Sequence, residues 1–130
     1  MEYRHKNASV SMINYHIVFC PRYRRHILVK QIKERLEEII NEVATNNNWN
    51  VIAKEVMPDH VHLFVSADTH TRPDIVVKRF KGRSSNLLRK EFPELLKMPT
   101  LWTRSYFLST AGNVSSSTIK KYIERQWDKV

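Results

Sequence analysis

Two histidines separated by one residue, His60 and His62, are the first feature of this 130-residue sequence that could do chemistry. Apolar residues surround them, so a strand would turn Val61 and Leu63 to one face and both imidazoles to the other. The two rings would then stand about 6.6–6.8 Å apart along the strand. Two neutral imidazoles on one face can hold a divalent metal ion. The alternative is a pair of ordinary surface histidines on a half-exposed strand.

A tyrosine and a glutamine near the end of the sequence form a second candidate group. Tyr122 and Gln126 are four residues apart, so they would lie on one stripe of a helix. The phenol of Tyr122 could attack a phosphorus centre, and the amide oxygen of Gln126 could complete a metal site. The alternative is a tyrosine that anchors an amphipathic helix at the edge of the core.

Two further residues could belong to the same site. Asp59 precedes the histidine pair and could contact the metal or one of its ligands, although a residue that forms a turn is the simpler interpretation. His16 lies in an earlier apolar run and could face the same site from a neighbouring strand, or be an ordinary histidine of a sheet.

The charge balance indicates a polyanion as partner. Lysine and arginine number 22 and aspartate and glutamate 13, which gives a formal net charge of +9. Nucleic acid is the first choice for such a chain. The candidate DNA contacts lie in a basic loop and on a basic helix, and a solvated face is the alternative for both: Arg22, Tyr23, Arg24, Arg25, Lys78, Arg79, Lys81 and Arg83.

The composition excludes several common kinds of site. Only two glycines occur, Gly82 and Gly112, so there is neither a P-loop nor a dinucleotide fingerprint, and no nucleotide cofactor is expected. A single cysteine, Cys20, rules out an internal disulfide and a cysteine-based zinc cluster. No apolar run approaches the ~18–20 residues that span a bilayer. We therefore expect a cytoplasmic protein with no membrane partner.

The candidate residues need a scaffold, and the apolar spacing predicts four strands and three helices. The strands are expected over residues 12–20, 49–57, 60–67 and 101–110, and the helices over residues 30–46, 71–91 and 118–129. Pro58 and Asp59 form a tight turn between the second and third strands. Residues 111–117, with Gly112 and three serines, indicate a linker.

The first six elements have the order of the ferredoxin-like (RRM-like) fold, β-α-β-β-α-β. This α+β fold has a four-stranded antiparallel sheet with two helices on one face, and its other face is free to bind single strands. We predict one domain over residues 1–130, with a core over 1–110, the linker over 111–117 and a helix that carries the tyrosine over 118–130. The fold hosts many functions, so the site must decide the function.

The combination of these motifs resembles the small single-tyrosine transposases of the HUH nuclease superfamily (TnpA-like), which move minimal insertion sequences as single-stranded DNA. The resemblance covers nearly the whole chain. It lies in residues 15–19 with the basic 22–24, in 58–64, in 102–107, and in Tyr122 with Gln126.

The resemblance implies a specific chemistry. Tyr122 would be joined covalently to the 5′ phosphate of a cut strand, and the strand would be rejoined by reversal. Element ends would be recognised as hairpins, and a homodimer would pair the tyrosine helix of one protomer with the histidines of the other. A divalent ion on His60, His62 and Gln126 would assist. Mn²⁺ suits imidazole ligands, Mg²⁺ is abundant, and Zn²⁺ is possible on the ligands alone.

Three alternatives remain open at the level of sequence. A non-catalytic module could bind single-stranded RNA or DNA on the same fold. A metal-dependent phosphodiesterase could use water in place of the tyrosine. A domesticated relative could act on genomic repeats with the same chemistry.

Overall fold

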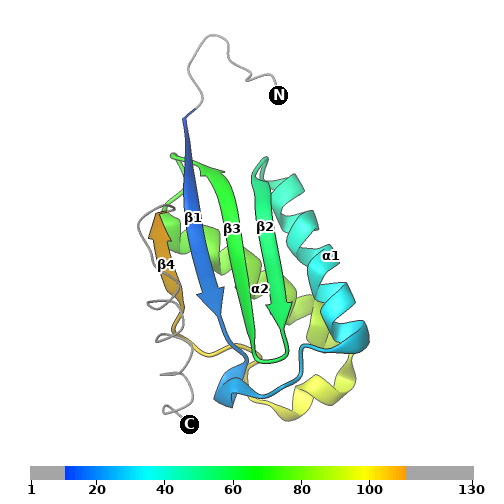
Figure 1. Ribbon diagram of the computed structural model, residues 1–130. Coiled ribbons are helices and arrows are strands. Elements are labelled where there is room, and N and C mark those ends of the chain that lie inside the picture. Colours follow the sequence, from blue (N-terminus) through cyan, green and yellow to red (C-terminus); the bar gives the residue numbers. More distant parts are fainter. Residues whose placement is uncertain (1–10, 111–130) are drawn as a thin grey trace.

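The computed structural model describes residues 11–110, which form a four-stranded antiparallel sheet with two helices on one face (Figure 1). The order of elements is that of the ferredoxin-like fold, as predicted: β1 (Met12–Phe19), α1 (Lys30–Asn46), β2 (Asn50–Met57), β3 (His60–Asp68), α2 (Pro73–Glu91) and β4 (Phe107–Thr110). The strands lie in the order β2-β3-β1-β4, so β3 and β1 are central. The predicted linker and tyrosine helix, 111–117 and 118–130, lie outside the described residues.

Alternation along β3 determines which face of the sheet is buried. Val61, Leu63 and Val65 are fully buried in the core, whereas His60 and His62 fall on the other face. A shift of one residue would exchange the two faces, so the burial of these three side chains fixes the orientation of the histidines. In the register with β1, Val18 lies opposite His62.

The helices bury one apolar stripe each against the inner face of the sheet. Leu36, Ile39 and Ile40 do so from α1, and Val76 and Phe80 from α2. Close packing of these side chains supplies most of the stability of the fold.

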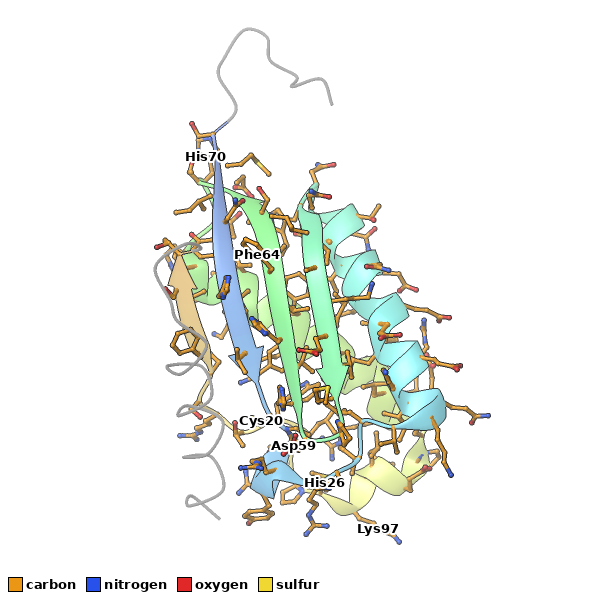
Figure 2. The ribbon with its side chains drawn as sticks, viewed as in Figure 1. Cys20, His26, Asp59, Phe64, His70 and Lys97 are labelled. Carbon is orange, nitrogen blue, oxygen red and sulfur yellow. The ribbon has the colours of Figure 1, made fainter. Side chains whose placement is uncertain are left out.

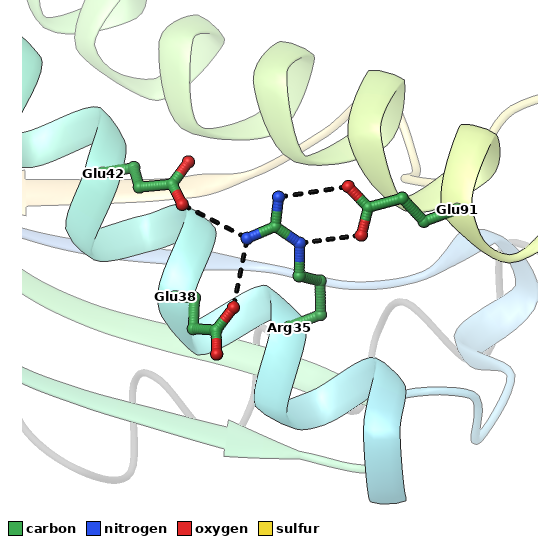
Figure 3. A network of polar contacts seen from close by, with 4 residues as sticks. All are labelled: Arg35, Glu38, Glu42 and Glu91. Carbon is green, nitrogen blue, oxygen red and sulfur yellow. Dashed lines mark hydrogen bonds and ion pairs between the residues drawn. The ribbon is translucent and has the colours of Figure 1, made fainter.

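One arginine also links the outer sides of the two helices (Figure 3). Arg35 of α1 binds both carboxylate oxygens of Glu91 of α2, at 2.7 and 3.1 Å, and contacts Glu38 and Glu42 of its own helix. Such exposed ion pairs stabilise by about 0–1 kcal/mol each, so the network aligns the helices more than it holds them together.

The predicted strand over residues 101–110 is wrong for its first half, because only Phe107–Thr110 pair with β1. Leu101 and Trp102 are buried instead, and the indole N–H of Trp102 donates to Ser84 Oγ at 3.1 Å. The backbone N–H of Thr103 donates to the carbonyl of Cys20. Trp102 forms one isolated antiparallel bridge with Pro21, so apolar burial and this single bridge, and not a continuous strand, account for the pattern there.

Other boundaries differ by a few residues. Helix α2 begins at Pro73, two residues later than predicted. The carboxylate of Asp68 accepts hydrogen bonds from the backbone N–H and the hydroxyl of Thr71, which keeps Thr71 in the turn before the helix. A short 3₁₀ helix, Pro93–Lys97, follows α2 and was not predicted. Within residues 11–110, no helix is both long and apolar enough to cross a membrane.

Candidate functional site

The side chains that could do chemistry gather on the face of the sheet opposite to α1 and α2. The rings of His16 on β1 and His62 on β3 lie with their centroids 5.3 Å apart, and the centroid of Phe64 lies 4.7 Å from that of His16. A hollow of about 250 Å³ opens beside them, and β2 supplies its other wall. Its lining residues come from three strands: His16, Ala53, Lys54, Glu55, His62 and Phe64.

His60 lies at the start of β3, where the tight turn holds its ring. Its Nδ1 is 2.9 Å from Oδ1 of Asp59, and the other carboxylate oxygen of Asp59 accepts a hydrogen bond from Nε of Arg24 at 2.8 Å. Burial would raise the pKa of Asp59, but the bonds from His60 and Arg24 outweigh burial and lower it. Asp59 is therefore a charged turn residue that also contacts a predicted metal ligand. Figure 2 shows Asp59 at this end of the sheet, near Cys20 and His26.

His62 lies one step further along β3 and is more enclosed. Burial lowers the pKa of His62, and the neighbouring His16 and His60 lower it further, against an opposing effect of Glu55. The neutral imidazole, which is the form that binds metals, is therefore favoured at neutral pH.

The residues present fit a divalent metal ion in part. With Nδ1 of His60 on Asp59, its Nε2 is the nitrogen left for a ligand bond, and His62 stands on the same face. Among residues 11–110 there is no group of three His, Cys, Asp or Glu residues placed to hold a metal. A third ligand must come from another kind of residue or from elsewhere. The predicted ligand Gln126 and the predicted nucleophile Tyr122 both lie outside the described residues.

The basic loop lies beside His60 and has an unusual backbone. Arg22–Arg24 form a 3₁₀ turn in which Tyr23 and Arg24 have φ of 61° and 52°. The Tyr23 ring is partly exposed, and the guanidinium groups of Arg22 and Arg25 lie 5.3 and 5.7 Å from its centre. Of the four DNA contacts predicted here, Tyr23 and Arg25 are exposed, whereas Arg24 is bound to Asp59.

The predicted DNA contacts on α2 lie on a helix that covers the opposite face of the sheet from the histidines. Lys78 and Arg83 are exposed. Arg79 donates to Asn47 and lies 5.8 Å from the centre of the Trp49 ring.

Lys81 of α2 is engaged within the protein. Its Nζ donates to the carbonyls of Thr103 and Arg104 at 2.7 and 3.3 Å, and burial lowers its pKa to about 8. This lysine therefore braces the segment before β4. The structure does not bring the α2 residues together with the histidine pair.

Two residues beside the histidines, Phe64 and Glu55, were not predicted as part of the site, although the sequence carries a signal for them. Phe64 and Glu55 are in phase with the histidines on β3 and on its partner β2, so alternation alone could have placed them on the same face. The bond from Arg24 to Asp59 joins residues 35 positions apart and had no local signal.

Comparison with known proteins shows the family of the chain. The family described as "Transposase IS200 like" matches residues 9–126. The chain is 35% identical to the ISDra2 transposase TnpA of Deinococcus radiodurans, over 99% of this chain and 94% of that protein. It is 26% identical to the transposase for insertion sequence element IS200 of Salmonella typhimurium, over 88% of this chain and 77% of the relative.

Solved structures show the same fold. A crystal structure from Deinococcus radiodurans R1, of a protein assigned as a transposase, superposes with a TM-score of 0.85 at 33% identity, covering 95% of this chain and 97% of that one. A REP-associated tyrosine transposase bound to a REP hairpin superposes with a TM-score of 0.58 at 14% identity, over 99% of this chain and 76% of that one. The second likeness is one of fold alone. From its sequence, its fold and these relatives, the chain belongs to the IS200-like transposase family.

Proposed function

We propose that this transposase cuts and rejoins single-stranded DNA at the ends of an insertion sequence through a 5′-phosphotyrosine at Tyr122. Membership of the family implies cleavage and transfer of DNA strands. The single observation that carries the finer proposal is the position of His60 and His62 on the same face of the sheet, where His62 lines a hollow.

The proposed step exchanges one phosphodiester for another. The phenol of Tyr122 gives up its proton as its oxygen bonds to phosphorus, the bond from phosphorus to the 3′ oxygen breaks, and that oxygen takes up a proton to leave as a 3′ hydroxyl. The exchange conserves the energy of the bond, so reversal on a new 3′ hydroxyl rejoins the strand without a nucleotide cofactor. A phenol has an ordinary pKa of about 10 and needs assistance to act as a nucleophile at pH 7.

His60, His62 and Gln126 are the proposed ligands of a divalent ion, Mg²⁺ or Mn²⁺. When bound, such an ion would polarise the scissile phosphate and neutralise the charge that develops on it. His62 contributes a neutral ring because burial lowers its pKa, and His60 contributes a ring whose Nδ1 is held by Asp59.

The proposed substrate is a single strand that folds into a hairpin at the element end. A structural relative at low identity is known bound to a REP hairpin, which is consistent with this choice. In this chain, the exposed ring of Tyr23 near the guanidinium groups of Arg22 and Arg25 has the chemistry that stacks a base and holds phosphates.

The proposed assembly is a two-fold dimer in which Tyr122 of one protomer acts with His60 and His62 of the other. Exchange of an identical element between protomers is a low-cost route to a dimer. The predicted linker over residues 111–117 gives the tyrosine helix the length of chain for such an exchange.

A labelled oligonucleotide tests the proposal. A single-stranded element end that carries its label on the 3′ side of the cut should become attached to the protein and survive boiling in detergent. The 5′ fragment should end in a free 3′ hydroxyl. Release of both fragments without any attached label would favour a phosphodiesterase that uses water.

A further inference from the structure

The carboxylate of Asp59 connects a predicted metal ligand to the basic loop. Oδ1 lies 2.9 Å from Nδ1 of His60, and Oδ2 accepts the bond from Nε of Arg24 at 2.8 Å. The side chains of all three residues are largely buried, with exposed fractions of 14% for Asp59, 17% for His60 and 21% for Arg24. Each oxygen of Asp59 thus has its own partner, and the carboxylate cannot rotate without breaking one of these bonds.

The backbone holds Arg24 in place for this contact. Tyr23 and Arg24 adopt positive φ, which non-glycine residues rarely do, and the N–H of Arg24 donates to the carbonyl of Pro21 at 2.8 Å. Further along, the N–H of Leu28 donates to the carbonyl of Pro58 at 3.1 Å, which ties the chain after the loop to the β2–β3 turn. A backbone kept in an uncommon conformation is over-determined by its surroundings, and here those surroundings direct Arg24 at Asp59.

The hydrogen bond between Asp59 and His60 affects how the imidazole can bind a metal ion. A carboxylate that accepts from Nδ1–H selects the tautomer whose Nε2 is free, fixes the plane of the ring and makes the ligand more basic. A guanidinium on the same carboxylate balances its charge, and it occupies the oxygen that would otherwise be free to bind a metal ion itself.

We infer that Asp59 and Arg24 are positioning residues for His60, and that Arg24 serves the metal site and not the DNA. The inference rests on the proposed role of His60 as a metal ligand. It divides the basic loop by function, because the exposed Tyr23 and Arg25 remain available to DNA while Arg24 is committed to Asp59.

The first test needs neither metal nor DNA. In metal-free protein above pH 8, nitrogen NMR of the histidine rings reports which ring nitrogen carries the proton. His60 should be protonated at Nδ1 in the wild type, and this preference should be lost in Asp59→Ala. A His60 ring protonated at Nε2 in the wild type, or unchanged in Asp59→Ala, would overturn the inference whatever the protein does to DNA.

The second test measures Mn²⁺ binding by electron paramagnetic resonance of the free ion. Asp59→Ala should raise the dissociation constant about 10- to 100-fold, as is typical when the partner of a metal-bound histidine is lost. Arg24→Gln should raise it in the same direction by less, and Arg24→Lys, which keeps the charge, should restore part of the loss. Unchanged affinity in Asp59→Ala and Arg24→Gln would overturn the inference.

The matched control is Arg72→Gln, since Arg72 also pairs with an aspartate, Asp74, at 3.1 Å but on an exposed surface. This variant should leave the His60 tautomer and Mn²⁺ affinity unchanged. If Asp59→Ala fails to fold, as judged by its thermal unfolding, Asp59→Asn replaces it, because the amide keeps the shape and loses the charge. Absence of Mn²⁺ binding by the wild type would contradict the proposed metal site, and the tautomer would still decide the role of Asp59.

Discussion

The imidazole of His16 on β1 lies edge-on to that of His62 on β3, with 5.3 Å between the ring centroids. The two strands pair antiparallel, and their inner faces are filled by buried apolar side chains. The sheet therefore presents its histidines as a rigid group on the open face, since neither strand can shift by one residue without burying them. Of the two interpretations of His16 from sequence, the structure supports a place beside the predicted metal ligands.

Removal of metal should stop strand cleavage, and His62→Ala should weaken its recovery. EDTA is expected to abolish adduct formation with a single-stranded element end, and Mn²⁺ or Mg²⁺ to restore it. His62→Ala removes one of two imidazole ligands, so at least tenfold more Mn²⁺ should be needed for half-maximal recovery, in line with the cost of even indirect changes at metal sites. His70→Ala is the control, because His70 is exposed at the far end of β3. Full cleavage activity in EDTA would show that the reaction needs no metal ion.

Cys20 should resist alkylation until the protein unfolds. Burial, with a further effect of the charge on Asp59, raises the pKa of its thiol to about 12. At pH 8 the reactive thiolate is then about one part in 10⁴, against about one in four for an ordinary thiol. Iodoacetamide followed by mass spectrometry should label Cys20 slowly in native protein and fast in urea. Rapid labelling of folded protein would show that the end of β1 is open.

The raised pKa of Cys20 also makes the free energy of unfolding depend on pH, with a sign that can be worked out. A thiol whose pKa is raised on folding keeps its proton to higher pH in the folded protein. Its contribution to the free energy of unfolding is therefore complete below about pH 9 and is lost as the pH rises toward 12. Lys81, whose pKa burial lowers to about 8, contributes with the opposite sign. The comparison is therefore between wild type and Cys20→Ala in urea at pH 8 and pH 10. Wild type should lose about 1.5–2 kcal/mol more stability than the variant between these two pH values.

Tyr23→Ala should weaken binding to single strands without changing its dependence on salt. Loss of one stacked base costs about 1–3 kcal/mol, or roughly 5- to 150-fold in affinity. Arg25 lies two residues after Tyr23 and is also exposed. Arg25→Gln should instead lower the slope of log affinity against log salt by about 1. Fluorescence anisotropy with a labelled hairpin at several salt concentrations separates the two effects. Equal affinities of wild type and Tyr23→Ala for the hairpin would show that the Tyr23 ring does not contact the DNA.

The sequence predicted the elements of the core and the orientation of the histidine pair. Alternation of apolar residues around His60 and His62 is a local signal, and the burial of Val61 and Leu63 confirms it. The segment before β4 was wrongly predicted as a continuous strand, because the alternation there reflects the burial of Leu101 and Trp102 and a single bridge between Trp102 and Pro21.

The link between Arg24 and Asp59 could not be predicted for a different reason. A hydrogen bond between distant parts of the chain depends on how the loop folds in space, and the positive φ of Tyr23 and Arg24 has no signature in residue type. A basic loop in a basic protein indicates DNA, and only the structure separates the arginine that faces inward from its exposed neighbours.

Mixing two inactive variants should restore cleavage if the sites are shared between protomers. At a Mn²⁺ concentration that only just supports wild-type cleavage, His62→Ala and Tyr122→Phe are each expected to be inactive alone. In a mixed dimer with trans sites, one site carries both defects and the other is intact, so activity should approach a quarter of wild type when equal amounts exchange freely. Differently tagged subunits verify the exchange. A mixture that stays inactive after verified exchange would show that each site is built within one protomer.

If Tyr122 is the nucleophile, it becomes covalently joined to DNA, and the position of the adduct can be mapped. Wild-type protein is incubated with a single-stranded element end, digested with trypsin and nuclease, and analysed by tandem mass spectrometry. A nucleotide phosphate is expected on Tyr122 and on no other tyrosine. Tyr122→Phe should form no adduct while binding the same hairpin with unchanged affinity. An adduct on another residue, or one that persists in Tyr122→Phe, would contradict the role of Tyr122 as the nucleophile.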